Sequence, residues 1–307
     1  VKTPTYEQNN NGSTASGFAV VSTDNATGGT TPAPKGTIAV SGEGNYVGAI
    51  GIGTLVKNKY EGFEDASYAV SGGKFNHAIL PEYCADGFIP TKNTDGTFGV
   101  KEGTYVAEVK GVKYETLQAA INAAPEKAIV TLLADTRENV TIAKRLTLDL
   151  NGYTINGGTE KGKPAVTVTA RVTIKDSSAA QTGKIMREDT AKNSGVSSHY
   201  VIDIQGAGWL TFESGNVINN SGNNAGKGAS LVRVGDDSVA KQPGLNIKGG
   251  TFTQDNFIVI KVDRGFFYLN GGTLNSESSY AIENWHGATV KGGTVNGAVS
   301  SWTYSRG

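Results

Sequence analysis

The sequence has very few of the residues that build disulfide frameworks, metal centres and membrane spans. Cys84 is the single cysteine among 307 residues, which excludes an internal disulfide and a cysteine-rich metal site. The three histidines are His77, His199 and His286, and no two have the spacing of metal ligands on one element. A run of about 18 apolar residues is also missing, so the sequence predicts no membrane-spanning helix.

An excess of charge of either sign is absent as well. The 28 lysines and arginines balance 28 aspartates and glutamates. A nucleic-acid-binding protein needs a basic excess to displace counterions, so we expect no nucleic-acid partner. Phosphate-cradling and dinucleotide-binding motifs are missing too, because the glycines are not followed by a helical pattern. We expect no cofactor; Ca²⁺ is the one ion that the acidic residues leave open.

Glycine is abundant, with 42 copies, and it recurs in one phrase. "KGGTF" begins at Lys248 and returns as "NGGTL" at Asn270 and "KGGTV" at Lys291. A fourth copy, "SGGKF", begins at Ser71. Periods in the twenties indicate a solenoid. We expect these glycines to form tight corners, where a positive φ costs glycine nothing. The pairs are Gly72–Gly73, Gly249–Gly250, Gly271–Gly272 and Gly292–Gly293.

From Ala128 onward, apolar and polar residues alternate in short runs such as "AVTVTARVTIKD" and "FIVIKV". This period of two is typical of strands with one face turned inward. Repeats made only of strands favour a parallel β-helix over a leucine-rich repeat, whose Leu/Asn ladder is missing. The sequence therefore predicts an all-β, right-handed single-stranded parallel β-helix of about 21–22 residues per coil. Polar inserts account for the longer steps.

One amphipathic helix is expected before the first long coil. Leu117, Ala120, Ile121 and Ala124 lie at i, i+3, i+4 and i+7, and Pro125 ends the pattern. Such a helix would cover the open end of the solenoid. The expected divisions are a polar arm, a small β-rich region ending in a hairpin, a strand with the capping helix, and the β-helix: 1–36, 37–105, 106–127 and 128–307.

Several segments resemble a known family. "VAEVKGVKYETLQAAINAA", "RLTLDLNGYTINGG" and the closing phrase "SGGKF…DGTFGV" resemble a domain that recurs in large surface proteins of Gram-positive gut bacteria. Those proteins are similar to the pectin-lyase-like β-helix group. The resemblance implies an extracellular protein of the bacterial cell surface, with a structural or adhesive role and with host or cell-wall glycans as candidate partners.

Enzymatic alternatives need convergent carboxylates, and Ca²⁺-binding acids in the case of a lyase. The galacturonase signatures Gly-His-Gly and Arg-Ile-Lys are absent, so we expect no catalysis; a polysaccharide lyase or glycoside hydrolase is the alternative. A glycan-binding module is a third option, for which Trp285–His286 or a strand face of exposed aromatics would be the platform. The candidate groups are Asp236–Asp237, Asp263–Arg264, Asp203 with Arg233, and Glu283 with His286.

The final copy of the phrase is followed by no helical or polar cap. A solenoid end needs a cap, so a cut within a longer domain and an assembly interface are both open explanations. In the second, copies join head to tail into a fibre, with the arm or the segment 37–75 docked on a neighbour's last coil. The residues expected at that interface are Phe18, Val20, Val21, Val295, Val299, Trp302 and Tyr304.

Overall fold

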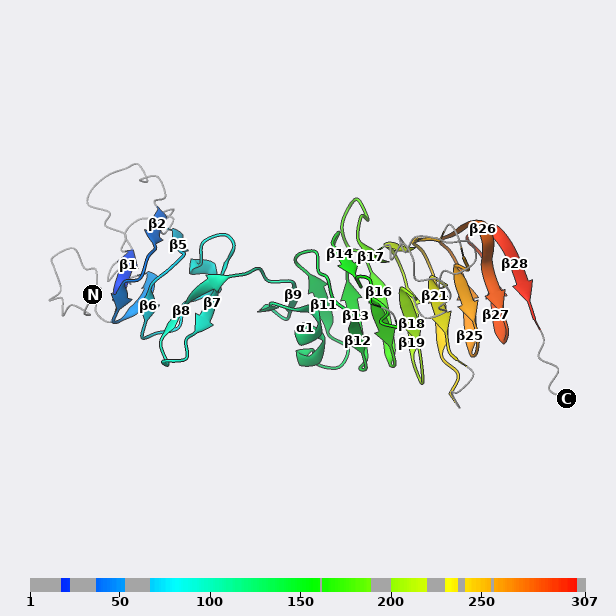
Figure 1. Cartoon of the computed structure of the whole chain (residues 1–307), viewed down its shortest axis with the longest axis horizontal. Coiled ribbons are helices and arrows are strands. Elements are labelled where there is room, and N and C mark those ends of the chain that lie inside the picture. The colour runs from blue at the N-terminus through cyan, green and yellow to red at the C-terminus, as the bar shows by residue number, and fades with distance from the viewer. Residues whose placement is uncertain are drawn as a thin grey trace, which may run out of the picture. The chain divides into compact units, whose positions relative to one another are not determined.

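A computed structural model describes most of the chain, which divides into two compact units, Val1–Thr104 and Tyr105–Gly307 (Figure 1). Most of the arm at 1–36 lies outside the described residues, as do His199, Asp237 and Tyr304. The side chains of Phe18 and Val21 are not described either. The described residues are 18–22, 37–52, 67–160, 162–188, 200–219, 230–236, 241–254 and 257–302.

The second unit is a right-handed parallel β-helix, which confirms the predicted fold class. One wall, called here the first sheet, has nine strands in the order β10-β9-β11-β13-β16-β19-β22-β25-β27. All pairs from β11 to β27 are parallel. Its strands are β9 (Ala107–Val109), β10 (Val112–Tyr114), β11 (Ile129–Leu132), β13 (Leu146–Asp149), β16 (Arg171–Lys175), β19 (Trp209–Phe212), β22 (Gly244–Ile247), β25 (Phe266–Leu269) and β27 (Gly287–Val290).

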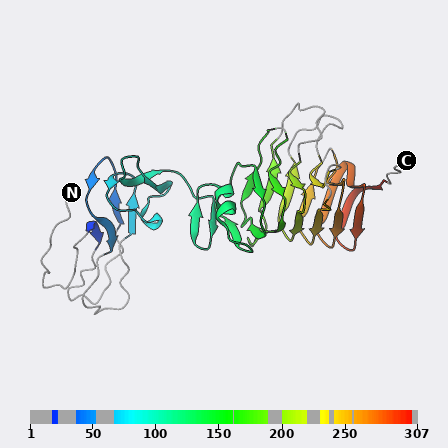
Figure 2. The ribbon, with the colours of Figure 1, turned by 90° about the horizontal axis from the view of Figure 1, so that it is seen from below.

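The other strands form an eleven-stranded sheet whose two arms meet at β26 (Thr273–Asn284), with β28 (Thr294–Ser301) paired beyond it. Each arm is a further wall of the tube (Figure 2). One arm contains β14 (Thr154–Asn156), β17 (Lys184–Arg187), β20 (Asn216–Asn219) and β23 (Thr251–Thr253). The other arm contains β12 (Val140–Ile142), β15 (Val166–Val168), β18 (Ile202–Ile204), β21 (Val232–Val234) and β24 (Ile260–Val262).

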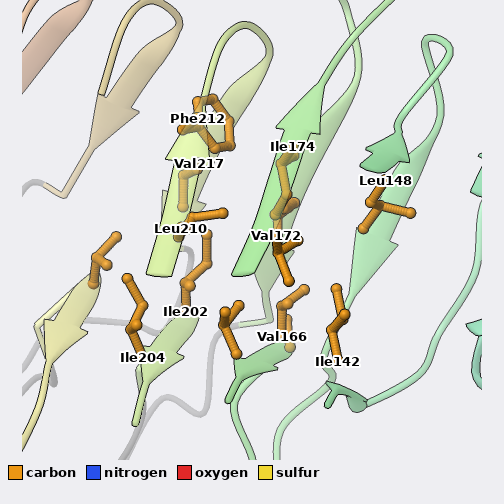
Figure 3. Close-up of a cluster of buried hydrophobic side chains, with 14 of the residues drawn as sticks. Ile142, Leu148, Val166, Val172, Ile174, Ile202, Ile204, Leu210, Phe212 and Val217 are labelled. Carbon is orange, nitrogen blue, oxygen red and sulfur yellow. The ribbon is translucent and has the colours of Figure 1, made fainter. Parts of the chain in front are cut away.

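The core fills the tube because equivalent apolar residues stack from coil to coil. Leu148 pairs with Ile174 and Ile174 with Phe212 along the first sheet. Figure 3 shows these side chains in rows that face those of the opposite walls, such as Val166 and Ile202. All five are fully buried. Each row places apolar groups in contact, so burial of apolar area stabilises the stack at about 25 cal/mol per Å².

The predicted coil length holds for the last coils and not for the earlier ones. On one arm Phe252 pairs with Leu274 and Leu274 with Val295, so each of these coils has the predicted length. Earlier on the same arm Ile155 pairs with Ile185, which is a longer step. The extra residues lie between strands, so the pairing is the same whatever the length of the insert. Loop-closure entropy grows only slowly with length, so such inserts destabilise the fold little.

The two glycines of each corner phrase have different functions. The second one bends the chain: Gly250, Gly272 and Gly293 have φ of 85°, 81° and 87°. The first one allows the coils to approach, because a methyl group at Gly249 would collide with the carbonyl oxygen of Glu213 in the coil below. After the corner, the chain turns inward: Phe252 and Leu274 are buried in the core, and Val295 is partly buried against it.

The first coil is capped by α1 (Leu117–Ala123) and by the antiparallel β9–β10 hairpin. Leu117, Ala120 and Ile121 are buried, as the periodicity predicts. Glu138 accepts hydrogen bonds from the backbone N–H of Leu117 and of Gln118 at the helix start. The Gln118 side-chain amide donates to the carbonyl of Thr141 in β12 and accepts from its N–H, and it thereby closes the edge of that strand.

The first unit is itself made of stacked parallel strands. β1 (Phe18–Ser22) pairs with β4 (Ala49–Ile52), β2 (Thr37–Val40) with β5 (Ser67–Val70), and β3 (Asn45–Tyr46) with β6 (Lys74–Phe75), all in parallel. The hairpin of β7 (Phe88–Lys92) and β8 (Phe98–Glu102) then pairs antiparallel with β6 and ends the stack. Its turn contains Gly96 with φ of 84°. The short 3-10 helix η1 is Pro81–Tyr83.

Within that unit, the corner at Gly72–Gly73 has the geometry of the later copies. Gly73 has φ of 97°, and a methyl group at Gly72 would lie 2.5 Å from the Gly42 carbonyl oxygen of the preceding coil. Phe75 after the corner is buried and stacks on Tyr46 with ring centroids 4.7 Å apart. The sequence patterns predict only short β runs here, although the repeated phrase is present.

Candidate functional site

Three of the candidate charged residues, Asp203, Arg233 and Glu283, lie in one row with Lys261 on the outside of one arm. Asp203 pairs in register with Arg233, Arg233 with Lys261, and Lys261 with Glu283, on β18, β21, β24 and β26. These four residues and Asp263 are called here the charged ladder. The structure thus brings together side chains from successive coils that are far apart in sequence.

Asp203 and Arg233 form the tightest pair of the charged ladder. The guanidinium donates from Nε and Nη2 to the two carboxylate oxygens at 2.9 and 2.6 Å. It also lies over the ring of Tyr200, 4.4 Å from the centroid. The Asp203 and Arg233 side chains are only 4% and 19% exposed, so the pair is held away from water. Burial would lower the pKa of Arg233, but the hydrogen bonds and charge of Asp203 outweigh it and raise that pKa.

The rest of the charged ladder is paired as well. Burial alone would lower the pKa of Lys261, but the charge of Asp263, 3.0 Å away, outweighs it and raises that pKa. The Trp285 indole N–H donates to the Glu283 carboxylate at 2.8 Å. Trp285 in turn stacks on Trp302, at 5.4 Å between centroids and 18° between planes. At the residue considered as an alternative sugar platform, one indole face is therefore covered by a second indole.

The remaining candidate residues lie in turns. A ring nitrogen of His286, Nδ1, is 2.8 Å from the Gly265 carbonyl oxygen, and the ring meets Phe266 edge-on. Asp263 and Arg264 precede Gly265, whose φ of 94° is that of a tight turn. Asp236 is half-buried, and its charge acts on Arg233 of the charged ladder. Acids that neutralise neighbouring cations in this way stabilise the stack of coils.

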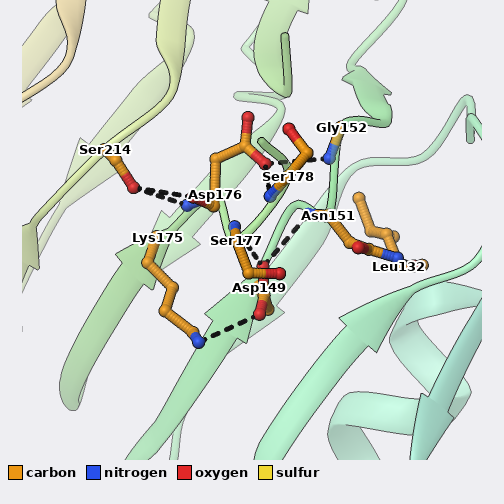
Figure 4. A network of polar contacts seen from close by, with 9 residues as sticks. All are labelled: Leu132, Asp149, Asn151, Gly152, Lys175, Asp176, Ser177, Ser178 and Ser214. Atoms are coloured by element: carbon orange, nitrogen blue, oxygen red, sulfur yellow. Dashed lines mark hydrogen bonds and ion pairs between the residues drawn. The ribbon is translucent and has the colours of Figure 1, made fainter. Parts of the chain in front are cut away.

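A second polar network lies at the corner after β13 and β16, where the sequence patterns predicted no site (Figure 4). Asp149 accepts from the backbone N–H of Asn151 and of Ser177, and its other oxygen lies 3.1 Å from the Lys175 ammonium. Burial alone would raise the pKa of Asp149, but these hydrogen bonds lower it below its usual range. Asp176 likewise accepts a backbone N–H from the neighbouring coil. Each carboxylate thus ties two successive coils together.

The signal for this network is present in the sequence as an aspartate that precedes a turn residue by two positions. Asp149 to Asn151 and Asp176 to Ser178 both have this spacing, and both make the local side-chain-to-backbone bond of an Asx turn. The bonds between coils, such as that from Ser177 to Asp149, cannot be seen in the spacing, because the coils differ in length.

A third feature, on the outside of the first sheet, was also absent from the expected sites. Lys127, Arg145 and Arg171 occupy neighbouring positions on successive coils, and Trp209 pairs with Arg171 on the next. The three exposed cations are called here the cation row. They line a hollow of about 280 Å³ that also includes Trp209. The sequence signal is a repeated phrase, "RLTL", "RVTI" and "WLTF", whose first residue faces outward.

Cys84 in the first unit is half-buried and free. Burial, and then the charge of Glu82, raise the pKa of its thiol to about 11. The thiol therefore stays protonated at neutral pH. Cys84 is thus a poor nucleophile.

The fold and these surfaces define a parallel β-helix protein with paired charges on its outer walls. Comparison with protein-family models gives no match, and neither do comparisons with curated proteins and with solved structures. Within the described ranges, no three or more His, Cys, Asp or Glu side chains converge as metal ligands would. None of the helices described is long and apolar enough to cross a membrane.

Proposed function

We propose that this chain is a non-enzymatic structural and adhesive component of a bacterial cell surface, built like the pectin-lyase-like β-helix proteins of Gram-positive bacteria. The observation that carries the proposal is that both units use one building block. The corner Ser71–Phe75 of the first unit and the corner Lys291–Val295 of the second have the same glycine geometry between parallel strands. A chain of such blocks extends by addition of coils, as a surface stalk requires.

The pairing in the charged ladder supports a structural role over catalysis. A glycosidase needs one protonated and one free carboxyl group facing a cleft. Here Asp203 is held by Arg233, Asp263 by Lys261, and Glu283 by the Trp285 indole. The purified chain, incubated with acidic polysaccharides, is expected to release neither unsaturated products nor new reducing ends. Cleavage that Asp263→Asn or Glu283→Gln abolishes would establish the lyase or hydrolase alternative.

Self-association is a second candidate, favoured by the last described coil. Val290 and Val299 are 53% and 60% exposed there, whereas Leu269 and Ile282, with which they pair in the preceding coil, are fully buried. Trp302 is 45% exposed beside them. Among the described residues no strand pairs beyond β27 and β28, and the apolar side chains of this coil have the character of an interface between copies.

A neighbour's first unit is the partner in this hypothesis, adding its parallel strands beyond β27 and β28. One edge of β1 pairs with β4 of its own chain. The other edge, which includes Val20, would pair with the neighbour's last coil. Val295, which was also expected at the interface, packs instead against the core of its own chain. Its contribution to the interface is therefore limited to the part that stays exposed.

Electron microscopy of the full chain tests this hypothesis. Fibres are expected, and both deletion of 1–36 and Val299→Glu should abolish them. Val112→Glu is the matched control, since Val112 is a similarly exposed valine, at 54%, in the capping hairpin. Only particles of single-chain mass at high protein concentration, or fibres undiminished in both variants, would contradict it.

A further inference from the structure

The cation row is an unusual arrangement for an exposed sheet surface. Lys127 donates its backbone N–H to the Arg145 carbonyl, and Arg145 precedes Leu146, whose partner is Val172. The three cations therefore stand at or just before the starts of adjacent strands, which are separated by about 4.8 Å. Like charges in register repel each other and destabilise a sheet. No described carboxylate lies within ion-pair distance of any of them.

A neighbouring row of the same sheet has the opposite design. Asp149 pairs in register with Lys175 and lies 3.1 Å from it, and Glu213 and Lys248 are paired at 3.2 Å. These four residues are called here the paired row. Asp149, Lys175 and Glu213 stand on the same coils as Arg145, Arg171 and Trp209, at the opposite ends of the strands, and Lys248 stands on the next coil. Strand geometry therefore permits charge balance on this surface, and the cation row lacks it.

Trp209 continues the cation row and gives it an apolar partner. The Arg171 guanidinium lies 5.7 Å from the centroid of the Trp209 indole. On the far side of β22, the centroid of the Tyr268 ring lies 6.1 Å from the indole centroid. Gly244 pairs in register with Trp209, and a methyl group at this glycine would collide with the indole. The missing side chain at Gly244 thus leaves room for the indole to lie across the strand, half-exposed beside the cations.

The hollow joins these parts into one surface. It has a volume of about 280 Å³, and Thr147, Thr173 and Thr211 add hydroxyl groups between the cations and the indole. Guanidinium groups form paired hydrogen bonds with carboxylates and sulfates, which strengthens anion binding. Aromatic faces pack against the C–H groups of pyranose rings, and hydroxyls bond to sugar hydroxyls. The guanidinium and hydroxyl donors, the positive charge and the apolar indole face together match the chemistry of an acidic sugar.

We propose that the cation row, together with Trp209, binds a segment of an anionic glycan, with Arg145 and Arg171 on the acid groups and Trp209 against a sugar ring. Sulfated and carboxylated sugars share this chemistry. The site gives the adhesive role proposed above a class of ligand. Only its biological purpose rests on that role; the binding itself is argued from the side chains of the site. It is a binding site; none of its side chains is assigned a step of cleavage.

Calorimetric titration of the full chain at low ionic strength tests the site. The probes are a sulfated hexasaccharide, a carboxylated hexasaccharide, a neutral hexasaccharide and single-stranded DNA of equal charge. We expect saturable binding of the sulfated or the carboxylated hexasaccharide and negligible binding of the neutral one. The anionic hexasaccharide with the higher affinity identifies the acid group that the site prefers. No binding of either anionic probe, or equal affinity for DNA, would overturn the proposal.

Matched variants locate the binding. The double variant Arg145→Gln with Arg171→Gln should lower the affinity by about tenfold or more. The reason is that a hydrogen bond to a charged group contributes more binding free energy than a hydrogen bond between neutral groups. Trp209→Ala should weaken it about threefold through the lost ring contact. Lys248→Gln with Lys291→Gln removes equal charge from exposed positions of the same unit and should leave the affinity unchanged. Equal losses in both double variants would show nonspecific attraction and overturn the site.

Failure of the site and failure of the proposed function give different results. Absence of binding overturns the site and leaves the structural role intact. Cleavage of a bound glycan contradicts the non-enzymatic role but leaves the site in place. Circular dichroism of each variant verifies folding; the exposure of Arg145 and Arg171 makes unfolding by their substitution unexpected.

Discussion

The charged ladder and the cation row occupy two outer walls of the same β-helix and treat charge in opposite ways. In the charged ladder, Asp203 and Arg233 are mostly buried and fully engaged with each other. In the cation row, Arg145 and Arg171 are exposed and repel each other. Stacking of coils places equivalent residues about 4.8 Å apart in both cases. Charge balance thus separates the structural surface of this solenoid from a candidate binding surface.

The largest effect should come from breaking the charged ladder. Asp203→Ala leaves the Arg233 guanidinium, 19% exposed, without its partner, and should cost about 3–5 kcal/mol of unfolding free energy. Guanidinium chloride unfolding, followed by circular dichroism, measures it. The double variant Asp203→Ala with Arg233→Met should recover most of the loss, since no unpaired charge remains. A loss below about 1 kcal/mol in the single variant would contradict the buried-pair interpretation.

A smaller loss is expected in the paired row. Asp149→Asn retains the shape of the side chain but removes the charge that binds Lys175 and the backbone N–H groups of Asn151 and Ser177. We expect a loss of about 1–2 kcal/mol in the same unfolding experiment. Asp95→Asn, in an exposed turn of the first unit, is the control and should have little effect on unfolding of the second unit. Unchanged stability in Asp149→Asn would mean that the corner network is dispensable.

The pH dependence of stability gives a still smaller and more specific effect. The pKa of Asp149 is lowered in the folded state from its ordinary value of 3.8. Its contribution is therefore fully present above that value and is lost as the pH falls through the lower folded-state pKa. The difference in unfolding free energy between the wild type and Asp149→Asn should narrow below about pH 4. A difference that stays constant from neutral pH down to strongly acidic pH would contradict the lowered pKa.

The smallest effect should appear in the cation row, with the opposite sign. Arg145→Glu places a carboxylate between Lys127 and Arg171 and gives the row the alternation of the paired row. We expect a gain of about 0.3–1 kcal/mol, which salt should screen, together with loss of glycan binding. Arg145→Gln is the control and should change stability by less than about 0.5 kcal/mol. Destabilisation by Arg145→Glu would mean that the arginine makes structural contacts that its exposure does not suggest.

Much of the fold was predictable because it depends on local patterns. Alternation in "AVTVTARVTIKD" identifies inward residues such as Val166 and Val168, both fully buried. The glycine pairs locate the corners, since a positive φ at Gly250 and Gly272 is a local backbone requirement. The helix at Leu117–Ala123 follows from its period. The stacked strands of the first unit were missed, although "SGGKF" carried the same corner signal.

The surfaces were less predictable because they depend on register between coils. The interval from Asp203 to Arg233 is longer than that from Arg145 to Arg171, and the interval from Lys127 to Arg145 is shorter again. Inserts of different length change these intervals without changing the pairing, because loop closure depends weakly on length. Asp203 with Arg233 could be proposed as one candidate pair, but the cation row, whose members share no fixed spacing, was not found.

The sequence by itself determined that this chain bends at glycine pairs, alternates its side chains between inside and outside, and repeats. These are properties of single residues and their immediate neighbours, so no tertiary context is needed to deduce them. Only the tertiary structure decided which outward side chains meet. Hydrogen bonds between coils fix the register, and the register joins Asp203 to Arg233 while it leaves Arg145 and Arg171 facing water without a described counter-charge.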